Sequence, residues 1–321
     1  MASPHATRAA GLALGLLVDA AIGDPRRGHP VALFGRWAAR LEQTTYRDSR
    51  AAGAVHLLAA TLPVLALGVA AERASRRHPA AHVLATAAAT WAVVGARTLA
   101  HEGETLAAAL ADGDLDAARR RLPHLCGREP SDLDENELAR AAVESLAENT
   151  SDAVTCPLIW GACLGIPGLL VHRAVNTLDA MVGHRRPRYA RFGTASARLD
   201  DLMALLPARA TGLLACAVAP LAGGDPAAAW TTMLRDHAAH PSPNGGWCES
   251  AWAGALHVQL GGRNVYCSRV EERPLLGDGR RPDGTDIHRA ARLVRAVTAA
   301  GAAVAVTALG LAAARTQETH S

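Results

Sequence analysis

The sequence predicts an all-α fold, namely a polytopic helical membrane protein with about five spans and sizeable polar loops. Half of the 321 residues are apolar but only 3% are aromatic, so the core must consist mainly of Ala, Leu and Val. Such residues favour helices or pack closely between them. The mean hydropathy of +0.07 leaves a soluble protein of buried Ala-rich helices as the alternative. Five separate charge-poor stretches with Arg at their flanks favour the membrane.

The distribution of charge predicts where the spans lie. A membrane-spanning helix needs ~20 predominantly apolar residues. We expect spans at 54–71, 80–96, 153–171, 202–224 and 296–314, of which only the fourth is interrupted by an Arg. A shorter apolar run at 9–18 ends before Asp19. It lacks a convincing cleavage site, so we expect no removed signal peptide.

The third predicted span is interrupted by a Gly-Ile-Pro-Gly sequence at 165–168. This break permits either a kinked span or a re-entrant helical hairpin, provided that protein covers the freed backbone groups. The choice decides which later loops share a side of the membrane. Segment 23–52 holds six arginines against three in 72–79, which places the first loop in the cytoplasm by the positive-inside rule.

Polar segments separate the apolar runs. We expect a single integral membrane domain over 1–321, whose site is built by the segments 23–52, 101–152, 183–201 and 225–292. The last of these is rich in Gly, Pro, Asn and Asp, which predicts a loop-rich structure. The sequence has no internal repeat.

The charged residues exclude several classes of protein. The 33 basic residues nearly balance the 30 acidic ones, which is not the charge pattern of a nucleic-acid-binding protein. All 33 are Arg, so there is no Lys for a pyridoxal Schiff base, a P-loop or a protein kinase. The six cysteines form no CxxC pair and no zinc-ligand spacing, and we interpret those within apolar runs as small hydrophobic residues.

Three carboxylates precede the third predicted span at intervals of four residues: Glu144, Glu148 and Asp152. At this spacing they share one helix face, where like charges repel by a few tenths of a kcal/mol per pair. A solvated helix face is the plain interpretation. Because ionisable groups beside a membrane entry are usually functional, we expect a cation, a proton or nearby arginines to compensate them.

More polar residues lie around the next apolar run. Asn176 and Asp179 are three residues apart on one helix, and Asp200 and Asp201 precede the following span with Arg198 beside them. Carboxylates with other oxygen ligands suit Mg²⁺, which usually binds through one or two carboxylates and substrate phosphates. Arg198 is suited to bidentate contact with a phosphate.

The long polar segment gathers Asp236, His237, His240 and Asn244. Zinc is an alternative here, but no third His or Cys follows at a structural spacing. A His that accepts a proton beside a Gly/Pro-rich turn is the better functional interpretation. Near the N-terminus, Asp24 and His29 stand in a Pro-bracketed turn. Together, these motifs predict a phosphate- and cation-handling site at a membrane surface.

Four segments carry a resemblance to a known family. They are GDPRRGHPVALFGR, ARAAVESLAENTSDAVTCPLIW, HRAVNTLDAMVGHRRPRYARFGTASARLDDLMALLPAR and RDHAAHPSPNGGWCESAWAGALHVQLGGRNVY. They resemble the CobD/CbiB family, the membrane-bound adenosylcobinamide-phosphate synthases of cobalamin biosynthesis, in order over nearly the whole chain. Ala153, Ala180 and His184 depart from the usual Gly, Ser and Tyr, and these departures concern local packing. An unrelated pyridoxal-dependent decarboxylase that shares the name is excluded by the missing Lys.

The resemblance implies an ATP- and Mg²⁺-dependent ligase that joins a carboxyl group of adenosylcobyric acid to (R)-1-amino-2-propanol phosphate. On this basis we assign Mg²⁺ to Glu148, Asp152, Asp179 and Asp201, and nucleotide phosphate to Arg198 and Asp200. His240 is the expected base, with Asp236 second. The remaining candidate catalytic residues are Asn149, Asn176, Asn244 and Asp24.

The implied partners are a corrinoid, an aminoalcohol phosphate and the lipid bilayer, with no nucleic acid. The expected location is the cell membrane, which the chain crosses several times. The expected protein partners are a second copy of this chain, in a homo-oligomer, or other enzymes of the corrinoid pathway. A transporter is a rival interpretation, since broken helices and intramembrane polar residues are transporter features; the absence of an inverted repeat speaks against it. A non-catalytic scaffold of the pathway is a second rival.

The five charge-poor runs predict that the protein fractionates with membranes and stays there in alkaline carbonate. Sedimentation of a cell lysate, followed by carbonate washing and immunoblotting, measures this. Recovery of a monodisperse protein without detergent would contradict the membrane interpretation.

Overall fold

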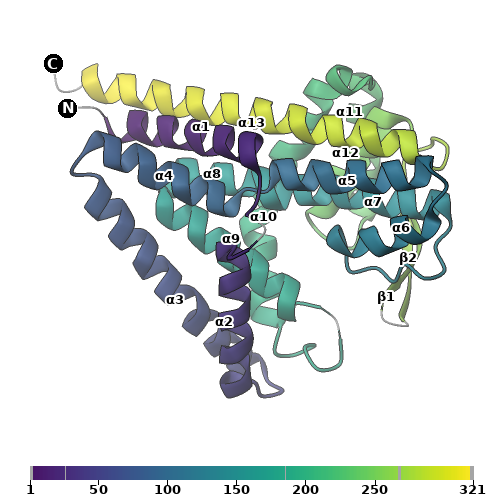
Figure 1. Cartoon of the computed structure of the whole chain (residues 1–321), viewed down its shortest axis with the longest axis horizontal. Coiled ribbons are helices and arrows are strands. Elements are labelled where there is room, and N and C mark those ends of the chain that lie inside the picture. Colours follow the sequence, from purple (N-terminus) through teal and green to yellow (C-terminus); the bar gives the residue numbers. More distant parts are fainter. Residues whose placement is uncertain (1–2, 26, 185, 267–268, 319–321) are drawn as a thin grey trace. The chain divides into compact units, whose positions relative to one another are not determined.

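The computed structural model describes residues 3–25, 27–184, 186–266 and 269–318 and confirms the all-α fold class. The chain divides into two compact units (Figure 1). Unit 1 comprises Met1–Gly95, Cys156–Ala204 and Ala302–Ser321, and unit 2 comprises Ala96–Thr155 and Leu205–Gly301. Two long helices, α10 (Thr194–Val218) and α13 (Gly284–Glu318), contribute residues to both. The expected single membrane domain over 1–321 stays a prediction.

Unit 1 is a bundle of helices. Besides parts of α10 and α13 it contains α1 (Pro4–Ile22), α2 (Pro30–Thr45), α3 (Arg50–Ser75), α4 (Pro79–Val93), α8 (Cys156–Leu164) and α9 (Ile166–Val182). Helices α1, α2, α4 and α9 each have a Pro in the first turn, where the missing N–H costs no hydrogen bond. Such positions fix where these helices begin.

Two glycines let α1 and α4 pack closely, side by side in Figure 1. A Cβ added at Gly11 would lie 2.5 Å from Thr86 Cβ, and one at Gly15 would lie 2.5 Å from Thr90 Cβ. Small residues four apart are the usual means of close helix approach in a membrane, where van der Waals packing replaces the hydrophobic effect. Contact between α1 and α4 therefore depends on the absence of side chains at these positions.

The Gly-Ile-Pro-Gly break forms a helical hairpin. Gly165 has a φ of 71° and ends α8, and a Cβ at Gly168 would lie 2.1 Å from Trp160 O, so the two helices fold back on each other. Buried Arg8 donates to Ala162 O at 3.0 Å, while Glu72 Oε2 accepts the Ile166 N–H at 2.9 Å. The backbone groups freed by the break are thus satisfied by a charged pair, as the hairpin alternative requires.

Five described helices are long and apolar enough to cross a membrane: Pro4–Ile22, Arg50–Ser75, Pro79–Ala111, Thr194–Ala222 and Gly284–Thr316. The predicted number is confirmed, but its membership was partly wrong. The run at 9–18 belongs to a full-length helix, because polar residues at both ends extend it. The run at 153–171 is not among the five, because Gly165 divides it.

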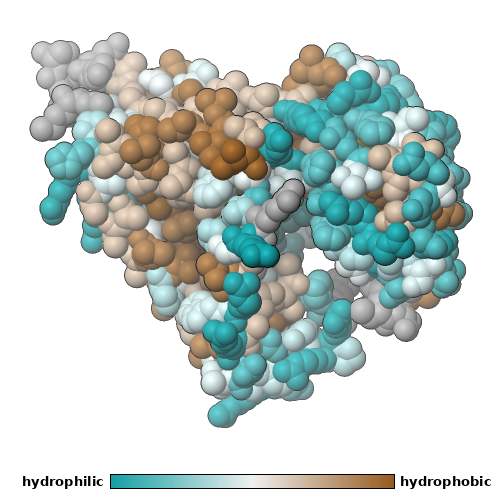
Figure 2. Space-filling model, in the orientation of Figure 1, coloured by the Kyte–Doolittle hydropathy of each residue, from teal (hydrophilic) through white to brown (hydrophobic). Residues whose placement is uncertain are grey.

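The surface agrees with this assignment. Large leucines on the candidate spans of unit 1 are exposed, among them Leu17 at 66%, Leu62 at 55% and Leu84 at 62%. Figure 2 shows apolar side chains gathered over the helices of unit 1. Contiguous exposed apolar surface of this kind marks contact with a membrane or a partner, and the length of the helices indicates a membrane.

Unit 2 contains α5 (Ala96–Ala111), α6 (Leu115–Arg121), α7 (Glu135–Thr150), α11 (Pro226–Asp236), α12 (Gly245–Leu256) and a hairpin of β1 (Leu260–Tyr266) and β2 (Arg269–Leu276). Its core includes fully buried Trp252, Leu138 and Leu146. The expectation that 225–292 is loop-rich was wrong. Its Pro and Gly residues begin and end short helices and shape the hairpin, with Gly261 and Gly262 both at positive φ.

The described cysteines are free thiols, and Cys156, Cys216 and Cys248 are buried as expected of small hydrophobic residues. Cys163, which also lies in an apolar run, is exposed because it stands near the end of α8. Cys267 lies outside the described residues.

The packing of α1 on α4 predicts that Gly15→Ala destabilises the protein by about 1–3 kcal/mol, the usual cost of overpacking. Gly310→Ala is the matched control, because Gly310 is also helical but has nothing within 4 Å of its added Cβ. Thermal unfolding in detergent should show a lower Tm for Gly15→Ala alone. Equal Tm values for the two variants would contradict the close α1–α4 packing.

Candidate functional site

Helix α7 positions the central residues of unit 2. It begins with a capping box, in which Asp134 Oδ1 accepts the Glu137 N–H at 2.8 Å and Glu137 Oε2 accepts the Asp134 N–H at 3.2 Å. A π-helical turn, Ser151–Thr155, follows the helix and carries Asp152. Such turns are frequent at functional sites because they alter the direction of side chains within a helix.

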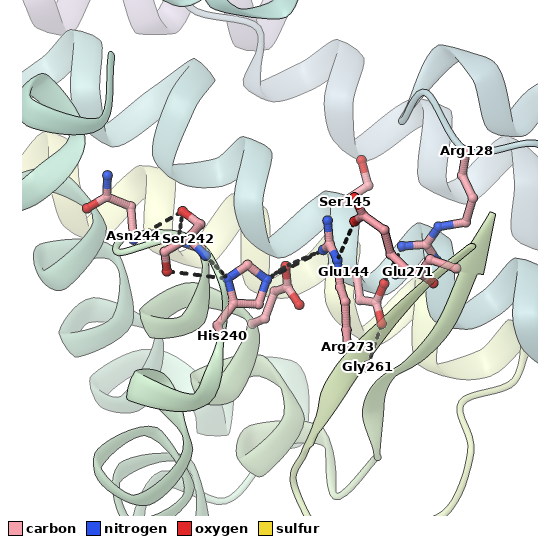
Figure 3. A network of polar contacts seen from close by, with 12 residues as sticks. Arg128, Glu144, Ser145, His240, Ser242, Asn244, Gly261, Glu271 and Arg273 are labelled. Atoms are coloured by element: carbon pink, nitrogen blue, oxygen red, sulfur yellow. Dashed lines mark hydrogen bonds and ion pairs between the residues drawn. The ribbon is translucent and has the colours of Figure 1, made fainter. Parts of the chain in front are cut away.

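Glu144 is buried and compensated by arginines. Its Oε2 lies 2.6 Å from Arg128 Nη2, its Oε1 lies 3.2 Å from Arg140 Nη1, and Oε1 also accepts the Gly261 N–H at 2.7 Å (Figure 3). Burial alone would raise the pKa of Glu144, but the two guanidinium groups and these hydrogen bonds hold it below its ordinary value. Of the three carboxylates in the predicted stripe, Glu144 is therefore an ionised structural residue.

Arg140, one of these two arginines, also fixes the β-hairpin to α7. Arg140 donates to Gly261 O at 2.7 Å, to Arg263 O at 2.8 Å and to Asn264 Oδ1 at 2.9 Å. One charged side chain thereby satisfies three acceptors of β1. The position of β2, which pairs with β1 and carries Arg273, follows from these contacts.

The other two carboxylates of the stripe join a third from α12. Glu148 is exposed, Asp152 is half-buried, and Glu249 is 1% exposed. Desolvation, followed by the negative charges of Glu249 and Asp152, raises the pKa of Glu148 to about 7. Because solvent reaches Glu148, we attribute the rise mainly to the like charges. Glu148 therefore lies under the influence of two other carboxylates as well as of Arg273 and His240.

His240 is the basic residue of this cluster. Its Nδ1 accepts the Ser242 N–H at 3.0 Å (Figure 3). Its Nε2 lies 3.3 Å from Glu249 Oε1. Arg273 Nη1 lies 3.4 Å from the same nitrogen. Burial would lower the pKa of His240, but the hydrogen bond and charge of Glu249 outweigh it and raise the pKa above its ordinary value.

The remaining predicted residues of unit 2 lie in other environments. Asp236 pairs with Arg235 at 2.6 Å and accepts the Gly277 N–H at 2.8 Å, and these contacts lower its pKa, with Arg235 as the main cause. Its carboxylate is a poor base in this state. Asn149 donates to Ser145 O at 2.9 Å within α7, and to Leu125 O at 3.4 Å in the segment after α6. Asn244 is buried and accepts from Arg209 at 3.4 Å.

A second acidic pair lies in unit 1. Burial, and then the negative charge of Asp201, raises the pKa of Asp179 to about 6. Asp200 is buried and Arg198 is exposed on the same helix. The four carboxylates assigned to Mg²⁺ are thus divided between the units, with Asp179 and Asp201 in unit 1 and Glu148 and Asp152 in unit 2.

The last two predicted residues, also in unit 1, have local partners. Asn176 accepts from Arg173 at 3.4 Å, and Asp24 Oδ1 lies 3.4 Å from His29 Nε2. Over the described residues, no group of three or more His, Cys, Asp or Glu side chains is placed to hold a metal ion. The zinc alternative at Asp236, His237 and His240 has no such ligand set.

Sequence reasoning missed Glu249, Arg273, Arg128 and Arg140 as members of these clusters. Two signals were available. Arg140 precedes Glu144 by four residues, the spacing of an ion pair on a helix. Glu249 is the only charged residue between 245 and 256, and an isolated charge in an apolar helix is buried at a cost unless it is paired.

The fold and this site define a helical membrane protein with clustered carboxylate, imidazole and guanidinium groups in a polar unit. The family described as "CobD/Cbib protein" matches residues 12–294. The chain belongs to this family.

Curated relatives extend over most of the chain. A protein of Mycobacterium tuberculosis strain H37Rv named "Cobalamin biosynthesis protein CobD" is 52% identical over 95% of this chain and 97% of its own. Relatives of the same name from Geobacter metallireducens and Rhodobacter capsulatus are 46% and 41% identical, over 83% and 89% of this chain and 86% and 93% of theirs. No solved structure matches the chain.

The Glu144 network predicts that Glu144→Gln destabilises unit 2 by about 3–5 kcal/mol, because it leaves two buried arginines without a counter-charge. Since the pKa of Glu144 is lowered from 4.5, its stabilisation is present above that pH and is lost as the pH falls through the folded-state pKa.

Thermal unfolding from pH 2.5 to 8 measures both effects, because the loss of stabilisation lies below pH 4.5. Glu104→Gln is the control, because its pair with Arg295 is partly exposed and should contribute only ~0–1 kcal/mol. Equal losses of Tm for the two variants would show that the Glu144 network is not a main source of stability.

Proposed function

We propose that this protein is an adenosylcobinamide-phosphate synthase, which joins adenosylcobyric acid to (R)-1-amino-2-propanol phosphate with consumption of ATP. The observation that carries the proposal is the family match over residues 12–294, together with relatives named for cobalamin biosynthesis at up to 52% identity among those described. The charged cluster of unit 2 supports it by offering groups that suit this chemistry.

The reaction requires activation of a carboxylate. The γ-phosphoryl group of ATP passes to the carboxylate oxygen with release of ADP, and the amine then attacks the acyl carbon with release of phosphate. The ammonium must lose a proton before it attacks, so a base is needed. His240 is the proposed base, since Asp236 is occupied by Arg235 and Gly277.

The carboxylates of the cluster fit a Mg²⁺ that arrives with substrate phosphate. Mg²⁺ commonly binds through only one or two protein carboxylates plus phosphate oxygens. Glu148 and Asp152 repel one another, as the raised pKa of Glu148 indicates, and would be stabilised by a cation. The bound ion would neutralise developing phosphate charge. Asp179 and Asp201 are the proposed second pair, with Arg198 and Asp200 as phosphate contacts.

We place the enzyme in the cell membrane, crossing it several times, with a corrinoid and an aminoalcohol phosphate as substrates. One assay distinguishes it from a transporter or a pathway scaffold. Purified full-length protein in detergent is given adenosylcobyric acid, ATP, Mg²⁺ and aminopropanol phosphate, and the product is identified by mass spectrometry. No product at any substrate concentration would reject the proposal. Ethanolamine phosphate, which lacks one methyl group, measures amine specificity.

In this assay, Asp152→Asn should fold normally, because size and hydrogen bonding are kept. We expect turnover to fall by at least 100-fold, about 2.7 kcal/mol of transition-state stabilisation, and the half-saturating Mg²⁺ concentration to rise. Glu104→Gln is again the control. Loss of turnover with an unchanged Mg²⁺ dependence would contradict the proposed metal-binding role. Near-parental turnover would indicate that the carboxylates only form a solvated helix face.

A further inference from the structure

Helix α11 of unit 2 presents an apolar outer face. The exposed residues of this helix are Pro226, Ala227, Trp230, Thr231, Leu234 and Arg235. Trp230 is 45% exposed and Leu234 is 47% exposed. Because they are four residues apart, they are neighbours on one side of the helix. None of the exposed residues is acidic, and the single basic one, Arg235, forms ion pairs with Asp236 and Asp278. The outer face therefore carries little uncompensated charge.

Close packing fixes the inner face of α11. A Cβ added at Gly254 of α12 would lie 2.4 Å from Ala228 O, and one added at Gly212 of α10 would lie 2.7 Å from Met233 Sδ. The two neighbouring helices thus approach α11 at positions without side chains. Since this packing determines how α11 is rotated about its axis, the exposed position of its apolar side chains is a fixed feature of unit 2.

The outer face of α11 continues from a candidate membrane span. The span Thr194–Ala222 ends three residues before α11 begins. Within unit 2 this span exposes Leu206 at 65%, Leu213 at 47% and Leu221 at 70%. Its 29 residues exceed the ~20 that are needed to cross the hydrocarbon core. Because a span of this length ends at the membrane surface, α11 begins at the same level.

The residue types on α11 are those of a helix that lies in a membrane interface. Trp is enriched at the level of the lipid headgroups, where the apolar indole ring contacts acyl chains and its N–H remains near water. Interfacial helices bury Trp and Leu side chains in the boundary between headgroups and acyl chains. With 11 residues, α11 is too short to cross the bilayer. Its position after a span favours lipid over a second protein as the occupant of this face.

We propose that α11 lies in the lipid–water interface and that Trp230 and Leu234 contact the bilayer. This contact is additional to those of the spanning helices and does not depend on the proposed function. His237, directly after α11, has its Nδ1 2.9 Å from Met233 O. His240 follows three residues later. The lipid contact of α11 therefore holds the segment that carries His240 close to the membrane surface.

Quenching of Trp fluorescence by lipid tests the proposal. Full-length protein is reconstituted in phosphatidylcholine vesicles, with or without bromine near the headgroup end of the acyl chains. The emission of Trp230 is the difference between the parent protein and Trp230→Phe. Because an interfacial ring lies beside the acyl chains, brominated lipid should remove at least about half of this emission. Since the ring is exposed, Trp230→Phe should keep the parental Tm in detergent.

A Trp added at an exposed polar position is the matched control. Asn136 is exposed in the first turn of α7, within an acidic segment of the same unit. In the Trp230→Phe background, the added emission of Asn136→Trp should be quenched by acrylamide in the aqueous phase and not by brominated lipid. The proposal is overturned if Trp230 is quenched by acrylamide alone, which places it in water. Quenching by neither agent, which indicates a protein cover such as a second copy, or equal lipid quenching at both positions would also overturn it.

Photolabelling of the parent protein avoids dependence on folding of the variants. Vesicles contain a phosphatidylcholine with a photoreactive diazirine at its headgroup end, and labelled peptides are identified by mass spectrometry after irradiation. We expect label on residues 226–235 as well as on the span that precedes them. Label on the span without label on α11 would overturn the proposal.

Discussion

Burial of the Glu144 carboxylate between two arginines is the interaction on which the structure of unit 2 depends. An ionised group in a protein interior is tolerated only when counter-charges and hydrogen bonds replace water. Arg128, Arg140 and the Gly261 N–H supply these at 2.6, 3.2 and 2.7 Å. Arg140 also donates to carbonyl groups of β1. The residue that neutralises Glu144 on α7 therefore also positions the β-hairpin.

The acidic cluster one turn further along α7 has the opposite character. Glu144 is paired with two arginines, whereas desolvation and the negative charges of Glu249 and Asp152 raise the pKa of Glu148 to about 7. Residues of one type on one helix face therefore lie in two different electrostatic environments. The difference lies in their neighbours: arginines surround Glu144, while Glu148 is open to solvent and lies near other carboxylates.

Unit 1 shows how a helical membrane protein accommodates irregular backbone. The hairpin of α8 and α9 leaves carbonyl and amide groups that lipid cannot satisfy. Arg8 and Glu72 come from other helices, pair with each other at 3.2 Å, and bond to the two sides of the break. In the same unit, Gly11 and Gly15 allow close contact of α1 with α4. Unit 1 is therefore stabilised by a buried ion pair and by close helix packing at glycines.

The sequence by itself determined the helical class and the number of candidate spans, because hydropathy and helical periodicity are local properties of the chain. It also pointed to His240. Only the tertiary structure decided that 153–171 folds back at Gly165, that Glu144 belongs to two arginines, and that Glu249 joins Glu148 from α12. These depend on which distant segments meet: Arg128 and Gly261 approach Glu144 from 16 and 117 residues away, and no local pattern encodes such separations.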